Sequence, residues 1–69
     1  MNRMPVVSSN LVSVGYDAES MTLEVEFQRG SVYQYFDVPV SEYDQLLSAA
    51  SVGKYFCEFI RDCYRYVQL

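Results

Sequence analysis

The chain has 69 residues, enough for one small domain that buries about 60% of the surface its unfolded form exposes. Hydrophobic residues make up 51% and aromatic residues 16% of it, which excludes a disordered chain because such a composition can build a core. The net charge of −4 argues against a general nucleic-acid binder, since such proteins carry a basic surface. Residues 52–69 hold three basic and two acidic side chains, a net charge of +1, whereas residues 1–51 hold two basic and seven acidic ones, a net charge of −5. Any anion site is therefore expected at the C-terminal end.

The start of the chain has no apolar run long enough for a signal peptide, and no stretch approaches the ~20 apolar residues of a membrane span. We expect a cytoplasmic single domain over residues 1–69, in which residues 1–7 form a loosely ordered N-terminal lead. If Cys57 and Cys63 lie on one helix, they face different sides about 9 Å apart along its axis, beyond the reach of a disulfide. Both thiols are expected to be reduced.

Three segments have the alternation of β-strands. Residues 11–16 alternate apolar side chains and end at a polar turn. Residues 22–28 are the clearest strand, with apolar side chains on one side and polar ones, among them Glu24 and Glu26, on the other, as in a sheet with one buried and one solvated face. The third strand covers residues 32–38, and Pro39 closes it because proline cannot donate a ladder hydrogen bond.

The turn before the third strand decides which face that strand shows. A two-residue loop would require a positive φ at Arg29, whereas a three-residue loop places Gly30 in the left-handed region without steric cost. The second register is preferred, and it pairs Phe27 with Ser31, Val25 with Tyr33 and Leu23 with Tyr35. Tyr33 and Tyr35 are then core residues, whereas the alternative register exposes both beside the acidic side chains of the second strand.

Two helices follow the strands. The first is expected to begin at Ser41, whose spacing to Asp44 resembles a capping box, and the second covers residues 54–64 with one apolar stripe. A break at residues 51–53 separates them, and residues 65–69 are expected to be extended and to pack back on the domain. The predicted fold is α+β, a three-stranded antiparallel meander followed by two helices packed on one face, in the order β-β-β-α-α.

The chain has no recognisable catalytic machinery. The absence of histidine excludes Ser-His and Cys-His nucleophile pairs, and two cysteines separated by five residues lack the spacing of a zinc site. Glu24 and Glu26 lie ~6.5–7 Å apart on one strand face, near the separation that glycosidases use, but a chain this small does not readily build the deep cleft required. A solvated strand face is favoured for them, and an inert, half-buried thiol for Cys57. We therefore predict no enzyme, no catalytic residue, no cofactor and no metal site.

Several short segments are distinctive through their order and spacing: Gly15-Tyr16-Asp17, residues 23–27, residues 30–35 with the Tyr33-Gln34-Tyr35 motif, Val38-Pro39, Ala50-Ser51, Gly53-Lys54-Tyr55-Phe56, Ile60-Arg61 and Tyr64. From about Ser8 to Leu69 the chain resembles the KTSC domain family, short bacterial proteins whose domain also occurs at the C-terminus of some lysyl-tRNA synthetases. Cys57 and Cys63 depart from the family's pattern. The function of the family is not established, so the resemblance implies a binding module, with RNA as a ligand suggested by the synthetase context.

Two functions are compatible with these observations. The favoured one is a protein-interaction module that binds a protein partner or a second copy of itself through its acidic sheet face, an open strand edge or a self-complementary contact. The alternative is a weak RNA-binding accessory domain that uses the second helix and the tail, where aromatic and basic residues alternate. The candidate RNA contacts are Lys54, Tyr55, Arg61, Tyr64, Arg65 and Tyr66. If Lys54, Arg61 and Arg65 form one contiguous patch, RNA binding is favoured. If the three side chains diverge, or pair with acidic residues, RNA binding is disfavoured.

Overall fold

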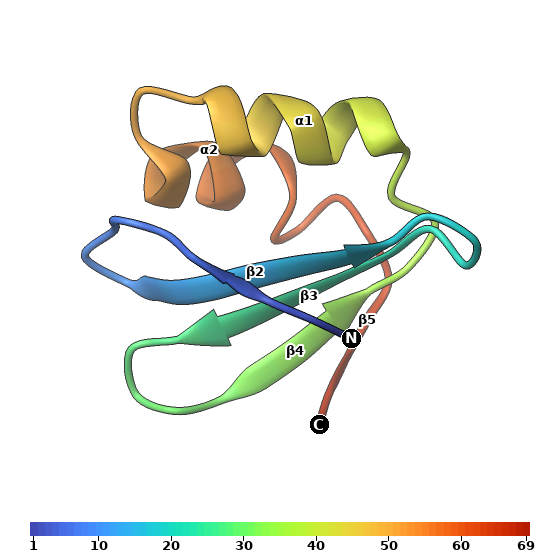
Figure 1. The fold of residues 1–69 in the computed structure, drawn as a ribbon, viewed down its shortest axis with the longest axis horizontal. Coiled ribbons are helices and arrows are strands. Elements are labelled where there is room, and N and C mark those ends of the chain that lie inside the picture. Colours follow the sequence, from blue (N-terminus) through green and yellow to red (C-terminus); the bar gives the residue numbers. More distant parts are fainter.

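The computed structural model describes residues 1–69, which form an antiparallel sheet covered on one face by two helices (Figure 1). The strands β1 (Met4–Pro5), β2 (Leu11–Asp17), β3 (Thr22–Phe27) and β4 (Val32–Tyr35) come first. The helices α1 (Val40–Ser48) and α2 (Val52–Phe59) follow, and β5 (Tyr66–Gln68) is the last element. The strands lie in the order β1-β2-β3-β4-β5, so each strand pairs with its neighbours in the chain. Neither helix is both long and apolar enough to cross a membrane.

The α+β class is confirmed, but the sheet has five strands rather than the three expected. The two further strands lie at its edges: β1 has two residues within the expected N-terminal lead, and β5 has three residues in the tail. Strands this short show no recognisable alternation of apolar and polar residues. They form only because they pair with strands distant in the sequence. The expectation of an extended tail that packs back is confirmed, because the Phe36 N–H donates to the Arg65 carbonyl at 2.9 Å and the Leu69 N–H to the Val32 carbonyl at 2.8 Å.

The register of the β3–β4 hairpin is the preferred one. Val25 lies opposite Tyr33 and Leu23 lies opposite Tyr35. The Phe27 N–H donates to the Ser31 carbonyl at 2.9 Å, and Gly30 has a φ of +96°, in the region that glycine alone adopts without strain. Both tyrosines of the motif therefore lie on the face that the helices cover.

The core lies between this sheet face and the helices. Its buried hydrophobic members are Leu11, Val14, Leu23, Val25, Tyr35, Val38, Leu46, Phe56 and Ile60. Phe56 of α2 is fully buried, and its ring lies 5.5 Å from that of Phe27 and 5.4 Å from that of Tyr35, centroid to centroid, in edge-to-face geometry. This contact holds α2 above β3 and β4.

The ends of the helices differ from the expected ones. Pro39 occupies the N-cap of α1 and no side chain caps that helix, so the predicted capping box of Ser41 and Asp44 is wrong: α1 begins before Ser41, which is already inside it. The expected break at residues 51–53 is instead the cap and first turn of α2, where the Ser51 hydroxyl accepts a hydrogen bond from the Lys54 N–H at 3.3 Å. The helix ends at Phe59, because Ile60 leaves the helical conformation with a φ of −120°.

The early end of α2 also separates the two cysteines. Cys57 lies within α2 and is half-buried, whereas Cys63 lies beyond the helix and is exposed. Both thiols are free.

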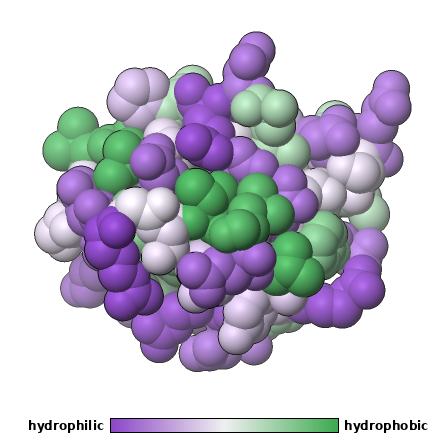
Figure 2. All heavy atoms as spheres, turned by 90° about the horizontal axis from the view of Figure 1, so that it is seen from below, coloured by the Kyte–Doolittle hydropathy of each residue, from purple (hydrophilic) through white to green (hydrophobic).

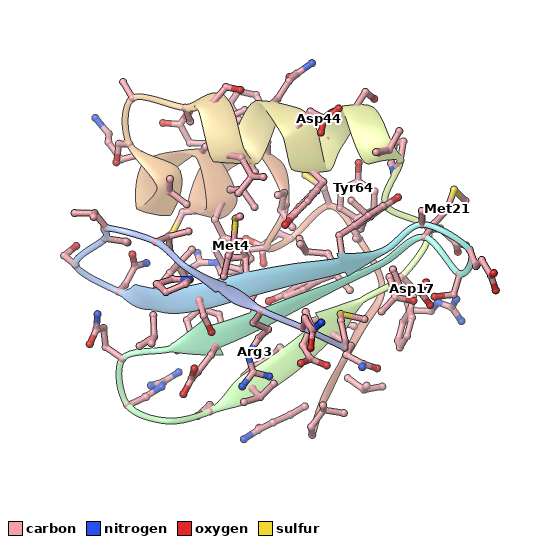
Figure 3. All side chains as sticks on the ribbon, viewed as in Figure 1. Arg3, Met4, Asp17, Met21, Asp44 and Tyr64 are labelled. Atoms are coloured by element: carbon pink, nitrogen blue, oxygen red, sulfur yellow. The ribbon has the colours of Figure 1, made fainter.

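The sheet face opposite the helices is not simply a solvated one, which corrects the expectation for Glu24. Only 6% of this residue is exposed. Arg3, which lies at the sheet (Figure 3), donates a hydrogen bond from Nη1 to Glu24 Oε2. The Nε of Arg3 also donates to the Ser13 hydroxyl at 3.1 Å, and Gln34 donates to Glu24 Oε1 at 2.9 Å. Burial alone would raise the pKa of the Glu24 carboxyl, but the bonds from Gln34 and Arg3 and the Arg3 charge outweigh burial and lower the pKa below its ordinary value.

Seen from that side, the molecule shows apolar side chains surrounded by polar ones (Figure 2). Val67 of β5 belongs to this face, because it pairs with Gln34, and 45% of it is exposed. The N-terminal segment therefore covers the acidic part of the sheet, while the β5 side of the sheet stays open.

Candidate binding cleft

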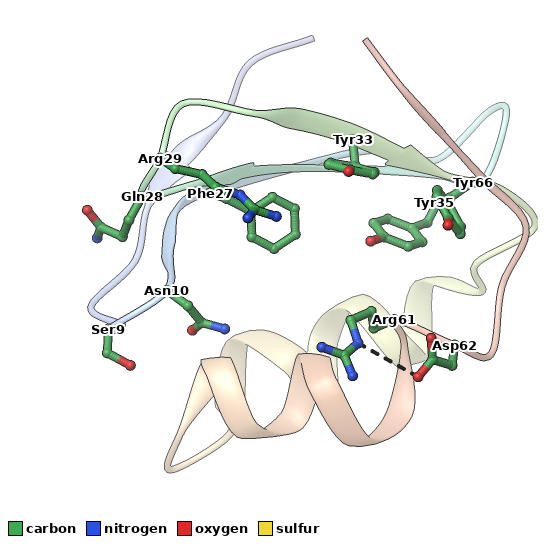
Figure 4. Close-up of a pocket in the computed structure, with 10 residues that line it drawn as sticks. All are labelled: Ser9, Asn10, Phe27, Gln28, Arg29, Tyr33, Tyr35, Arg61, Asp62 and Tyr66. Carbon is green, nitrogen blue, oxygen red and sulfur yellow. Dashed lines mark ion pairs between the residues drawn. The ribbon is translucent and has the colours of Figure 1, made fainter.

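A cleft of about 480 Å³ opens between the helix-facing side of β3, β4 and β5 and the turn that follows α2 (Figure 4). Its volume lies within the range of small-ligand sites, roughly 300–1,000 Å³. Four aromatic side chains and six polar or charged ones line it, namely Phe27, Tyr33, Tyr35 and Tyr66, and Ser9, Asn10, Gln28, Arg29, Arg61 and Asp62.

The aromatic wall follows from the strand registers. Phe27, Tyr33 and Tyr35 lie on the helix-facing side of the hairpin, and β5 adds Tyr66 because it lies opposite Tyr35. The ring of Tyr33 lies 5.4 Å from that of Phe27 and 5.7 Å from that of Tyr66, so the rings form one continuous surface. Tyr66 is 53% exposed and Tyr33 is half-buried, which leaves ring surface free to contact a ligand.

The deepest of these rings carries a hydroxyl that stays protonated. Tyr35 is 2% exposed, and its burial, with the neighbouring Tyr33 and Tyr66, raises its pKa to about 12. At neutral pH this hydroxyl is protonated, as that of any tyrosine is, and the raised pKa keeps it protonated at more alkaline pH as well.

The charged groups reach the cleft from two other parts of the chain. Arg61 and Asp62 come from the turn after α2, and Figure 4 shows Arg61 across the cleft from Tyr33 and Tyr35. The Nε of Arg61 lies 3.7 Å from Asp62 Oδ2, in a pair whose side chains are 57% and 80% exposed. Arg29 comes from the β3–β4 turn. The lining thus holds two arginines and one aspartate, a net charge of +1, in a chain whose net charge is −4.

The predicted RNA contacts do not form one surface. Of the three basic residues, only Arg61 lines the cleft, and Lys54 lines a separate hollow beside Ser8 and Cys57. Arg65 lies with its guanidinium carbon 5.2 Å from the centre of the Phe36 ring and pairs with Asp37 at 3.4 Å. The three basic side chains thus contact different features of the surface, which counts against a basic patch on the second helix and tail.

Two of the predicted aromatic contacts have structural partners instead. Tyr55 and Tyr64 both donate a hydrogen bond to the carboxylate of Glu42, the second at 2.9 Å (Tyr64 in Figure 3). The pKa of each tyrosine rises to about 12, for Tyr55 mainly through the bond to Glu42 and for Tyr64 mainly through burial and then that bond. These bonds join α1 to α2 and to the turn beyond it, so both hydroxyls serve the packing of the helices.

The cleft thus combines two predicted contacts, Arg61 and Tyr66, with the Tyr-x-Tyr motif that was expected in the core. Asn10 and Arg29 were not predicted. The sequence indicates a turn at Arg29, and its position two residues after Phe27, the last residue of β3, places it at the edge of the aromatic face. Nothing in the local pattern signals Asn10, which reaches the cleft from the loop before β2. Elsewhere in the chain, no group of three or more Cys, Asp or Glu side chains is placed to hold a metal ion.

Fold and site together define a small α+β domain whose helices leave one aromatic cleft open beside the last strand. Residues 7–66 match the sequence model of the KTSC domain. The chain belongs to the KTSC domain family, which confirms the resemblance seen in its motifs.

Similar proteins agree with this membership. The chain is 43% identical over 67 residues to an uncharacterized protein of Stutzerimonas stutzeri, with 96% of this chain and 94% of that one covered. It is 44% identical over 54 residues to a lysine–tRNA ligase of Trichormus variabilis, where the match covers 78% of this chain but only 10% of the ligase. A crystal structure of a KTSC domain protein from Yersinia pestis superimposes with a TM-score of 0.93 at 35% identity, covering 99% of this chain and 96% of that one. The five-stranded fold is therefore similar to that of a solved family member.

Proposed function

We propose that this KTSC domain is a non-catalytic protein-interaction module that holds an extended segment of a partner protein along β5, beside the aromatic cleft. One observation carries the proposal: the open edge of the sheet and the cleft are continuous, because Tyr66 belongs to both. All three residues of β5 are exposed. A partner strand added there would gain main-chain hydrogen bonds from the edge and side-chain contacts from the cleft.

The main chain of β5 is suited to strand addition. Its bonds to β4 involve the Arg65 carbonyl and the Leu69 N–H, and Val67 lies opposite Gln34 between them. In an antiparallel ladder alternate residues face the same neighbour, so the N–H and C=O groups of Tyr66 and Gln68 point away from β4. These are the groups that a partner strand would bind.

The opposite edge is less suited. The strand β1 has two residues, and one of them is Pro5, which has no N–H to donate. Both features protect an edge from pairing with another chain. The edge formed by β5 is also short, with three residues, but it contains no proline, so the N–H groups of Tyr66 and Gln68 are available to a partner strand.

The test is a selection of random twelve-residue peptides displayed on phage, carried out against the domain and against its Tyr66→Ala variant. We expect peptides that bind the unchanged domain and slow the amide hydrogen exchange of Tyr66 and Gln68. The matched control is Phe59→Ala, which removes a 50% exposed aromatic side chain of α2 and should leave binding unchanged. Selected peptides that bind equally to Tyr66→Ala, or that protect other amides, would contradict the proposal.

RNA binding is a second candidate, supported by arginines beside aromatic rings in the cleft and by relatives that are lysine–tRNA ligases. A single strand would stack a base on Tyr66 and place phosphates near Arg29 and Arg61. Two phosphate contacts give a slope of about −1.4 in a plot of log affinity against log salt concentration. An NMR titration with a pool of short RNAs at low and physiological salt tests this. The absence of shifts at the cleft residues at low salt would remove this candidate.

A further inference from the structure

The geometry points to the chemistry of the partner segment: it carries an aromatic and an acidic side chain two positions apart, both facing the cleft. This inference rests on strand addition at β5, the function proposed above, and adds what the segment must contain. It follows from three properties of the cleft, namely its exposed ring surface, its two available guanidinium groups and the spacing of side chains on a strand.

The aromatic member follows from the wall of the cleft. The rings of Tyr33 and Tyr66 lie side by side with their centres 5.7 Å apart, and more than half of Tyr66 is exposed. On a strand added to β5, one side chain would lie next to Tyr66 on the same face of the sheet. An aromatic ring there buries the exposed tyrosine surface and gains the edge-to-face or stacked contacts that the wall already shows.

The acidic side chain of the partner segment is inferred from the ion pairs that the arginines make or lack. Arg3 is fully engaged by Glu24, Glu26 and Ser13 on the other face of the sheet. In the cleft, Arg29 has no acidic side chain within ion-pair distance, and Arg61 has only its exposed contact with Asp62 at 3.7 Å. Such an exposed pair contributes little, so Arg61 can exchange Asp62 for a carboxylate of a ligand without much loss.

The spacing and the preference for a peptide have physical reasons too. Side chains two residues apart on a strand face the same side ~6.5–7 Å from each other, so an acid two positions from the aromatic residue can lie level with Gln68 and Tyr33, where Arg61 lies across the cleft (Figure 4). The lining has a net charge of +1, which one carboxylate balances. Each further phosphate of a nucleic acid would instead meet the remainder of the chain, which carries a net charge of −5 because the whole chain carries −4 and the lining +1.

The experiment uses seven-residue peptides with blocked ends and a threonine background, built around Phe-Thr-Glu or the reverse order Glu-Thr-Phe. Matched controls replace Glu with Gln or Phe with Ala. Binding is measured by ¹H–¹⁵N NMR titration of the intact domain. We expect one acidic order to shift Tyr33, Arg61 and Tyr66, its Gln analogue to bind ~3-fold more weakly, and its Ala analogue to bind more weakly still.

Protein variants identify the groups that hold the acid. Arg61→Gln should weaken the acidic peptide by ~3-fold and leave the Gln peptide unaffected, because only the acidic peptide uses the charge. Arg29→Gln tests whether the carboxylate reaches the Phe27 end of the cleft instead of Arg61. The control is Lys54→Gln, which removes the same charge from the separate hollow and should change neither affinity.

The outcomes separate this inference from the proposed function. Equal binding of the Glu and Gln peptides at Tyr66 and Gln68 would overturn the acidic anchor and leave strand addition standing. Failure of every designed peptide, while library-selected peptides protect the β5 amides, would overturn the motif alone. Failure of all peptides, with short RNA shifting the cleft residues, would overturn both.

Discussion

Loss of the Arg3 side chain should reveal how strongly the N-terminal segment is tied to the sheet. The proposed change is Arg3→Met, which keeps the aliphatic stem and removes the guanidinium from Glu24. The Glu24 side chain is 8% exposed and that of Arg3 is 29% exposed, so the variant leaves a nearly buried carboxylate with Gln34 as its remaining side-chain donor. Loss of a partner from a fully buried ion pair costs about 3–5 kcal/mol, and the partial exposure of Arg3 reduces the expected loss to about 2 kcal/mol.

The expected loss is a large share of the total, because a 69-residue domain has an unfolding free energy of about 3–10 kcal/mol. It should also depend on pH in a defined direction. The pKa of Glu24 is lowered in the folded protein, so the stabilisation is present above its unfolded value of ~4.3 and is lost as the pH falls through the folded pKa. Arg3→Met should therefore be strongly destabilising at pH 7 and nearly neutral once the carboxyl is protonated.

The assay is urea unfolding followed by circular dichroism at a series of pH values between 3 and 7. The double variant Arg3→Met with Glu24→Gln is the control, since it removes both charges and should recover much of the loss at pH 7. A loss below ~0.5 kcal/mol at pH 7, or the same loss at every pH, would refute this reasoning.

Three further variants test the packing of the helices. Phe56→Ala should lower the unfolding free energy by about 3–5 kcal/mol in a urea titration, because this fully buried ring joins α2 to the sheet. Gly53→Ala should destabilise by about 1 kcal/mol in the same titration, since the added Cβ would lie 2.4 Å from Asn10 Oδ1 and 2.8 Å from Ser8 Oγ, and Asn10→Ala in the same chain should recover only part of the loss because the Ser8 hydroxyl remains too close. Glu42→Gln should lower the pKa of Tyr55 from about 12 toward 10 in an ultraviolet titration, and an unchanged value would show that the carboxylate does not hold that hydroxyl.

The central sheet could be predicted because its signals are local. Each strand from β2 to β4 is indicated by residues close together in the sequence, and the turn requires a left-handed backbone conformation at Gly30. These local signals predict correctly which face of the sheet Tyr33 and Tyr35 occupy. The edge strands could not be predicted, because β1 and β5 are too short for a pattern and exist only through pairing with strands already formed. The burial of Glu24 was missed for a related reason: its partner Arg3 lies 21 residues away in the sequence.

The cleft was only partly predictable. Its aromatic face follows from the hairpin register, and Tyr66 was expected to pack back on the domain. The place of Arg61 depends on where α2 ends. The apolar stripe of α2 continues past Phe59 with no residue that signals the end of a helix, so this end could not be predicted. Lys54, Arg61 and Arg65 looked like one patch because a longer helix was assumed. The shorter helix and the turn after it direct the three side chains to different parts of the surface.

The connection between β4 and β5 has a consequence for the order of assembly. The strands β2, β3 and β4 follow one another through tight turns, so their pairing closes short loops and can form early. The pairing of β5 with β4 instead closes a loop of about 30 residues that contains both helices, and this closure carries a larger entropic cost. We therefore expect β5 to dock after the β2–β3–β4 meander has formed and to open before it in local fluctuations. A ligand that contacts both β5 and the cleft would hold β5 against β4. Binding at this site should therefore slow the local unfolding of β5.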